Sequence, residues 1–331
     1  MKQLNATTLS LLPIVRSTIE LVALNGSISA DVSPFPLDPI IFRGLKSLTL
    51  SEPQQESLLR LAQEGISVYS PHTAVDATPG GMADWLCDIV TGSETESRSE
   101  FFPPAPKTKQ PSATECSYSR PSYPRIPSDS INQASSRSDR PTPLSHIRTT
   151  IQLSPSPPSN FETAGMGRLV SFRTPQPLTS LIDRIGKSVG SPGGFAVAIP
   201  QTQQVDDIHI RTVGICPGSG SSILLQNGVP TADLLFTGEL SHHDALAAIE
   251  RGSTVITLFH SNSERGYLHD VMRLRLKTTL EVEWAAIAEE LGRVQDTDLQ
   301  DWKKAALSDR DVRVDVSERD RDPYGIVMLQ K

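Results

Sequence analysis

Aromatic side chains are scarce in this chain of 331 residues, at 5% of positions, whereas proline occurs 26 times. A chain with few large apolar groups and many prolines cannot bury enough surface along its whole length to offset the entropy lost on ordering. The length still allows one large domain or two modest ones. We therefore expect a folded core together with a segment that does not fold.

An excess of basic charge is also missing. The formal net charge is −7 and the sequence pI is about 5.5. Non-specific binding to DNA or RNA depends on lysine and arginine side chains that neutralise phosphates. The composition therefore argues against direct nucleic-acid binding.

Cysteines are few and long apolar runs are absent. Cys87, Cys116 and Cys216 form no CxxC pair and no zinc-ribbon spacing, which favours buried or incidental thiols in a reducing compartment. No stretch reaches the roughly 18 apolar residues of a membrane helix, and residues 9–24 lack the pattern of a secretory signal. We expect a soluble cytoplasmic protein, with the nucleus and the mitochondrion left open, and no membrane partner.

The composition changes abruptly after Val90. Residues 91–160 hold 16 serines and 12 prolines and show no apolar periodicity. This pattern predicts a disordered Ser/Pro-rich insert, whose simplest role is that of a solvated spacer.

Alternating strand and helix patterns flank the insert. Before it, Pro53 opens a helix after a possible cap at Ser51, residues 66–70 alternate as a short strand, and 82–89 repeat at helical spacing. After it, strands are predicted at 167–172, 195–199, 208–215, 232–236 and 254–259, and helices at 178–190, 241–251 and about 262–276. Strand–helix–strand order with short connections predicts parallel neighbours in an α/β fold.

Two strand ends carry the same chemistry. The strand ending at residue 70 leads into His72 and Asp76, and the strand ending at Phe259 leads into His260 and Glu264. Ligands collect beyond the carboxyl ends of parallel strands, and imidazole with carboxylate can hold a divalent cation. Structural roles are also open: a capping box for Glu264, a core position for His72 and an Asx turn for Asp76.

Further polar residues lie at the same predicted edge. Glu239, His242 and His243 follow the preceding strand and are candidates for outer contacts to a metal or for substrate contacts. Asp244 is alternatively part of a helix cap, with the histidine pair facing solvent. The Gly- and Ser-rich turn at 216–222 could cradle a phosphate through its backbone N–H groups, although a tight connection explains it equally simply.

Several segments together resemble the Nif-three-like family, the NGG-one-interacting factor three proteins that are also called GTP cyclohydrolase type-2 homologues. The resemblance covers residues 38–90 and 161–331 and rests on Ile41–Leu48, Ser70–Asp76, Gly165–Arg168, Thr237–Asp244, His260–Tyr267 and Asp320–Gly325. It implies two related α/β halves facing each other across a metal-binding cleft, and a ring-shaped hexamer. Residues 38–90 would form an incomplete first half, and 161–331 the second half and a C-terminal strand.

The resemblance also implies a site with two metal ions per subunit, zinc, manganese or iron. By position its ligands would be Asp76, His260 and Glu264, with Asp76 suited to bridging the ions. Asp38 stands where the family usually has a histidine, and residues 1–37 lack the family's usual opening segment. The implied activity is metal-assisted hydrolysis of a nucleotide such as GTP. The alternative is a non-catalytic protein that binds a transcription-related partner.

Overall fold

The computed structural model describes residues 48–63, 71–93, 142–157, 161–189, 194–293, 312–317 and 322–325. The chain divides into two compact units, the first made of Met1–Ala74 with Leu268–Ser317 and the second of Val75–Tyr267 with Glu318–Lys331. These boundaries differ from the predicted halves at 38–90 and 161–331. The difference arises because helix α4 (Met82–Thr91), expected in the first half, contacts strands of the second unit.

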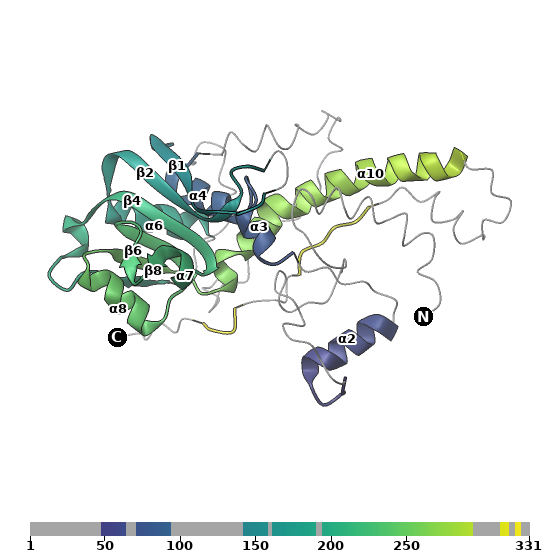
Figure 1. Ribbon diagram of the computed structural model, residues 1–331, viewed down its shortest axis with the longest axis horizontal. Coiled ribbons are helices and arrows are strands. Elements are labelled where there is room, and N and C mark those ends of the chain that lie inside the picture. The colour runs from purple at the N-terminus through teal and green to yellow at the C-terminus, as the bar shows by residue number, and fades with distance from the viewer. Residues whose placement is uncertain are drawn as a thin grey trace, which may run out of the picture. The chain divides into compact units, whose positions relative to one another are not determined.

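The second unit is built on a six-stranded mixed sheet (Figure 1). Its strands, in spatial order, are β1 (His146–Leu153), β2 (Gly165–Pro177), β4 (His209–Ser219), β7 (Leu234–Glu239), β8 (Thr254–Thr257) and β3 (Ala196–Ala198). The central strands β4, β7 and β8 are parallel, whereas β1, β2 and β3 pair antiparallel to their neighbours. The parallel centre confirms the α/β class.

Buried apolar residues make the centre of the sheet. Leu234, Leu235 and Phe236 of β7 are fully buried, as a parallel strand covered on both faces requires. Helix α8 (His242–Glu250) then begins at Ser241, whose side chain accepts a hydrogen bond from the Asp244 N–H. These features confirm the predicted strand–helix–strand unit around the cap at Ser241.

Helices from the early and the later part of the second unit's sequence pack on the sheet. Helix α4 contacts β2, β4 and α6 (Leu178–Ser188), while α7 (Ser221–Leu224) contacts β4 and α8 contacts β8. One buried cluster joins Cys216, Leu235, Val255 and Ala248 to α7. The core of the described part of the second unit is therefore formed mainly by the six-stranded sheet and these helices.

Strand β1 corrects the predicted extent of the Ser/Pro-rich insert. Residues 142–157 lie inside the predicted disordered segment 91–160, yet His146–Leu153 pairs antiparallel with β2. The strand was missed because its pattern is inverted: Arg148 is half-buried, whereas Ile147 is 61% exposed. Residues 94–141 and 158–160 lie outside the described residues.

The predicted long helix at about 262–276 is interrupted. A 3₁₀ turn η4 (Ser261–Ser263) and a single turn α9 (Arg265–Tyr267) come first, followed by a π-helical turn η5 (Leu268–Met272) and the long helix α10 (Arg273–Arg293). Contacts within the second unit explain the interruption. A Cβ on Gly266 would lie 2.5 Å from the Trp85 ring, so the backbone of this turn packs directly against the tryptophan. This packing accounts for the departure from a regular helix.

In the first unit, α2 (Pro53–Gln63) confirms the predicted first helix. The predicted strand at 66–70, Asp38, Cys116 and the N-terminal segment 1–37 lie outside the described residues. No helix in the described part of the chain is long and apolar enough to cross a bilayer.

Candidate metal centre

The carboxyl ends of the three parallel strands lie at one edge of the sheet. Strand β4 ends at Ser219, β7 ends at Glu239, and β8 leads through Leu258 into His260. Neighbouring residues of these strands are paired in register, with Thr237 opposite both Cys216 and Thr257. The edge on which the sequence placed the site therefore exists, and it brings Glu239 next to His260.

His260 lies between two carboxylates. Its Nδ1 atom is 3.0 Å from Glu239 Oε1, and its Nε2 atom is 3.4 Å from Glu264 Oε1. The His260 ring is about one-third exposed, and the Glu264 side chain is almost buried. Phe259, just before this histidine, has a φ of 69°, a left-handed conformation that a bulky residue rarely adopts. The sharp turn directs the His260 side chain toward Glu264, four residues later.

The backbone of Gly218 lies against this pair. Gly218 has a φ of 60°, and a Cβ added there would lie 3.0 Å from both His260 Nε2 and Glu264 Oε1. The Gly218 N–H donates to Ser263 Oγ at 2.8 Å, and this hydroxyl donates to the His260 carbonyl at 2.7 Å. Thr237 Oγ1 donates to the Gly218 carbonyl at 3.1 Å. Glycine here keeps space open in front of the imidazole and the carboxylate while its peptide is held in place.

These contacts decide between the two readings of the turn at 216–222. The Gly218 N–H is bonded within the protein, and Ser221 Oγ donates to Asp244 Oδ2 at 2.7 Å. Helix α7, which follows, has only four residues. The structure favours a tight connection over a phosphate cradle.

A capping box at Ser261 and Glu264 is not what the structure shows. The Ser261 N–H, which a capping box would direct to Glu264, donates instead to Asp322 Oδ2 at 3.0 Å. The Glu264 side chain faces His260. Asp322, from the tail segment that carries part of the family resemblance, therefore takes over the role of a cap for η4.

The Cys216 thiol is affected by the carboxylates of both Asp76, a predicted ligand, and Glu264. Burial, together with the nearby carboxylates of Asp76 and Glu264, raises the pKa of the Cys216 thiol to about 12, while Arg168 acts in the opposite direction. Asp76 lies on the short helix α3 (Thr73–Ala77) and is half-buried. Both carboxylates are thus close enough to one buried thiol to act on its charge.

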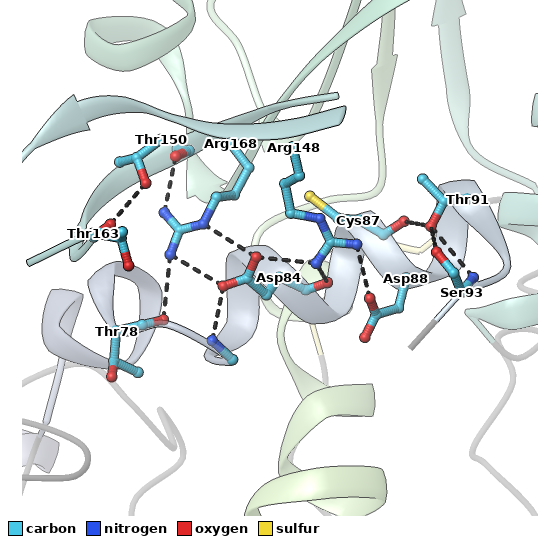
Figure 2. A network of polar contacts seen from close by, with 12 residues as sticks. Thr78, Asp84, Cys87, Asp88, Thr91, Ser93, Arg148, Thr150, Thr163 and Arg168 are labelled. Carbon is cyan, nitrogen blue, oxygen red and sulfur yellow. Dashed lines mark hydrogen bonds and ion pairs between the residues drawn. The ribbon is translucent and has the colours of Figure 1, made fainter. Parts of the chain in front are cut away.

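Arg168 fixes the chain just beyond Asp76. Its guanidinium donates to the carbonyls of Ala77 and Thr78 at 3.3 Å, and it binds Asp84 through Nε and Nη2, both at 3.2 Å. Figure 2 shows Arg168 and Arg148 reaching from their strands toward Asp84 on α4. This buried network positions the end of α3 against β2.

Burial would raise the pKa of the Asp84 carboxyl, but Arg168 and Arg148 hold it below its ordinary value. Arg148 also donates to Asp88 at 2.9 Å. Sequence reasoning quoted Arg168 only as part of a motif and missed Asp84 and Arg148. The available signal was the spacing of Asp84 and Asp88, four residues apart on one helix face.

The remaining candidates lie on α8 or in the first unit. His242 and His243 on α8 are exposed, and their rings meet edge-on at 5.5 Å. Asp244 closes the cap of α8, as the structural alternative proposed, and its pKa is lowered by hydrogen bonds from Ser221 and Ser241. His72 is exposed rather than a core residue and belongs to the first unit.

Comparisons with known proteins agree with this architecture. The profile of the family described as Duf34/NIF3 (NGG1p interacting factor 3) matches residues 38–290. The chain belongs to this family. The NIF3 homolog of Schizosaccharomyces pombe is 35% identical over 252 residues, which are 74% of this chain and 67% of that protein. The NGG1-interacting factor 3 of Saccharomyces cerevisiae is 29% identical over 236 residues, 71% and 64% of the two chains.

This NIF3-family chain spans about two thirds of the length of these two relatives. A Bacillus cereus protein related to NIF3 superposes with a TM-score of 0.50 at 16% identity, over 83% of this chain and 93% of that protein. At that identity the superposition shows the fold alone. The resemblance inferred from the sequence motifs is confirmed.

The donor pair at the strand edge fits a divalent cation. Two ligands about 2.1 Å from a tetrahedral zinc ion lie about 3.4 Å apart, which is the separation between His260 Nε2 and Glu264 Oε1. Glu239 faces the other ring nitrogen, as the outer carboxylate of a metal-bound histidine does. Across the described ranges, no three histidine, cysteine or carboxylate side chains already surround one point. The pair is thus a partial ligand set in an arrangement that suits an ion.

Proposed function

We propose that this protein binds divalent metal ions through Asp76, His260 and Glu264. The observation that carries the proposal is the separation of 3.4 Å between His260 Nε2 and Glu264 Oε1, beside a glycine whose Cβ would lie 3.0 Å from both atoms. Asp76 is proposed as the third donor from the family resemblance, and its carboxylate, like that of Glu264, raises the pKa of the Cys216 thiol. Imidazole with two carboxylates suits zinc, manganese or iron. The family resemblance adds a second ion bridged by Asp76.

Neighbouring residues orient the proposed ligands through hydrogen bonds. With the Nδ1–H of His260 donating to Glu239, Nε2, which faces Glu264, is the nitrogen that would ligate a metal. The side chains of Ser263 and Asp322 hold the His260 turn by hydrogen bonds to the His260 carbonyl and the Ser261 N–H. Arg168 holds the carbonyls that follow Asp76. The ligands are therefore supported from three separate segments of the chain.

We further propose metal-assisted hydrolysis of a nucleotide such as GTP. Bound ions would lower the pKa of a water molecule and polarise the bond under attack. The almost buried Glu264 and the partly exposed His260 ring place the donors where a substrate can approach from the solvent side. His242 and His243 stay candidates for proton transfer.

A hydrolysis assay with matched variants tests the enzyme proposal. GTP turnover is measured with added manganese or zinc for the wild-type protein, Glu264→Gln and Glu250→Gln. Glu250 is an exposed residue of α8 and controls for the loss of one carboxylate. We expect Glu264→Gln to lower turnover by at least 100-fold and Glu250→Gln to leave it unchanged. Equal turnover in all three proteins would refute catalysis at this centre.

A second candidate function is partner binding without catalysis. The Saccharomyces cerevisiae relative is named an interacting factor, which favours a protein partner for this chain as well. Strand β1 lies at the edge of the sheet, and its Ile147 and Leu153 side chains are about 60% exposed. Edge strands with apolar side chains pair readily with another chain. The predicted hexamer is one form that such pairing could take.

Metal analysis and the turnover assay separate the two functions. Bound metal without turnover of GTP would favour partner binding at the β1 edge over catalysis. In that case Ile147→Lys, which places a charge on the edge, is expected to abolish self-association or partner capture without changing the metal content.

A further inference from the structure

An exposed aromatic pair lies on the same turn as the metal donors. Tyr324 is 70% exposed, and its ring lies 6.0 Å from that of Phe259 at an angle of 36°. Phe259 directly precedes His260. A tyrosine that leaves most of its surface in water adds little to the stability of the fold, so its fixed position calls for another explanation.

The Asp322 carboxylate holds the backbone at Tyr324. Asp322 Oδ1 accepts from the Tyr324 N–H at 3.0 Å, and Asp322 Oδ2 accepts from the Ser261 N–H at 3.0 Å. Pro323 between them fixes its own φ angle, and the Asp322–Tyr324 bond forms an Asx turn. One carboxylate thus ties the tyrosine to the segment that carries His260.

The backbone that carries the Phe259 ring is also constrained. Phe259 has a φ of 69°, a conformation that costs a bulky residue free energy and is retained where the surroundings impose it. This turn places the Phe259 ring against Tyr324 and sends the next residue toward Glu264. The aromatic pair and the donor pair are therefore ordered by the same backbone geometry.

We propose that Phe259 and Tyr324 form a stacking platform for the planar base of a nucleotide. The inference rests on the proposed function, since it assigns the base of the same substrate whose reacting part meets His260 and Glu264. Aromatic side chains bind bases of any sequence through their ring faces, and a ring ordered in advance loses little entropy on binding. The net charge of −7 disfavours broad electrostatic attraction of phosphates, so stacking would supply much of the affinity.

Two fragment probes separate the platform from the metal centre. Guanosine, which has a base but no phosphate, reports on stacking alone and is followed by ligand-observed NMR. Inorganic triphosphate, which has no base, is followed by calorimetry on the manganese-loaded protein. The variants are Tyr324→Ala, which removes the ring, and Tyr324→Phe, which keeps it. The exposed position of Tyr324 lets both variants fold.

We expect Tyr324→Ala to weaken guanosine binding about tenfold, the loss expected for one base–aromatic stack, and Tyr324→Phe to keep it. Triphosphate binding and metal content should be equal in all three proteins. The platform would be overturned if the protein did not bind guanosine, or if Tyr324→Ala bound it as well as the wild type. A change in the oligomeric state of Tyr324→Ala would also overturn it, because the ring would then belong to a contact between copies. If the wild-type protein binds guanosine but no metal, the metal proposal is refuted and the stacking platform stands.

Discussion

The guanidinium of Arg168 meets the carboxylate of Asp84 side-on, with Nε 3.2 Å from Oδ1 and Nη2 3.2 Å from Oδ2. Both side chains are about 95% buried, and Arg148 contacts the same carboxylate at 3.1 Å. The pair joins β2 and α4 to the carbonyls that follow Asp76. A structural ion pair therefore sets the position of a predicted metal ligand.

Replacing Asp84 with asparagine should destabilise the protein by about 3–5 kcal/mol, because two buried arginines lose a charged partner. The free energy of unfolding is measured by urea titration. Asp183→Asn is the control, since it makes the same change at an exposed position of α6 in the same unit. A loss that is no larger for Asp84→Asn than for Asp183→Asn would show that the network contributes little.

The same variant should change the pH dependence of stability. The two arginines hold the pKa of Asp84 below its ordinary value, so its contribution is present above about pH 4 and is lost as the pH falls through the folded pKa. The difference in unfolding free energy between wild type and Asp84→Asn should be constant from about pH 5 to 7 and narrow below pH 4. A difference that widens in acid contradicts this assignment.

Gly218→Ala should cause a loss of bound metal and only a modest loss in the free energy of unfolding. The new methyl group would lie 3.0 Å from His260 Nε2 and Glu264 Oε1, in addition to the strain of a φ of 60°. Gly228→Ala is a matched control, because Gly228 has a φ of 73° and open space around its Cβ position. We expect both variants to lose about 1 kcal/mol of stability and only Gly218→Ala to lose bound metal. Equal metal content in the two variants would mean that the space before the donors holds no ion.

Cys87 and Cys216 should resist alkylation in the folded protein. Burial raises the pKa of each thiol to about 12, so roughly one molecule in ten thousand carries the thiolate at pH 8. Peptide mass spectrometry after brief iodoacetamide treatment should find both cysteines unmodified in buffer and modified in urea. Rapid modification of Cys216 in buffer would place it at the surface.

Sequence periodicity was a reliable guide where burial follows a simple pattern. The unit from β7 through α8 to β8 was predicted because its strands are continuous apolar runs and Ser241 is a strong cap. Strand β1 was missed because Arg148 faces inward to meet Asp84 and Asp88, which inverts the usual alternation. A buried charge pair cannot be recognised until both partners are placed.

The sequence indicated the contact between His260 and Glu264 but not the contacts that surround it, and metal binding by this pair stays a prediction. The spacing of His260 and Glu264 at a strand end indicated the donor pair. The roles of Gly218, Ser263 and Asp322 depend on hydrogen bonds from a backbone N–H to a side chain 45 or 61 residues away, which no local pattern encodes. The exposure of His242 and His243 could not be read from the sequence, because residue type alone does not show which way a helix turns its side chains.

Metal titration of three proteins tests the central claim most directly. Zinc or manganese binding is measured by equilibrium dialysis and elemental analysis for the wild type, Asp76→Asn and Glu264→Gln. If Asp76 and Glu264 hold the ions together with His260, the wild-type protein binds metal stoichiometrically and each variant loses affinity by at least tenfold. Wild-type affinity retained in Asp76→Asn, or no metal bound by the wild type, would contradict a centre shared by these residues.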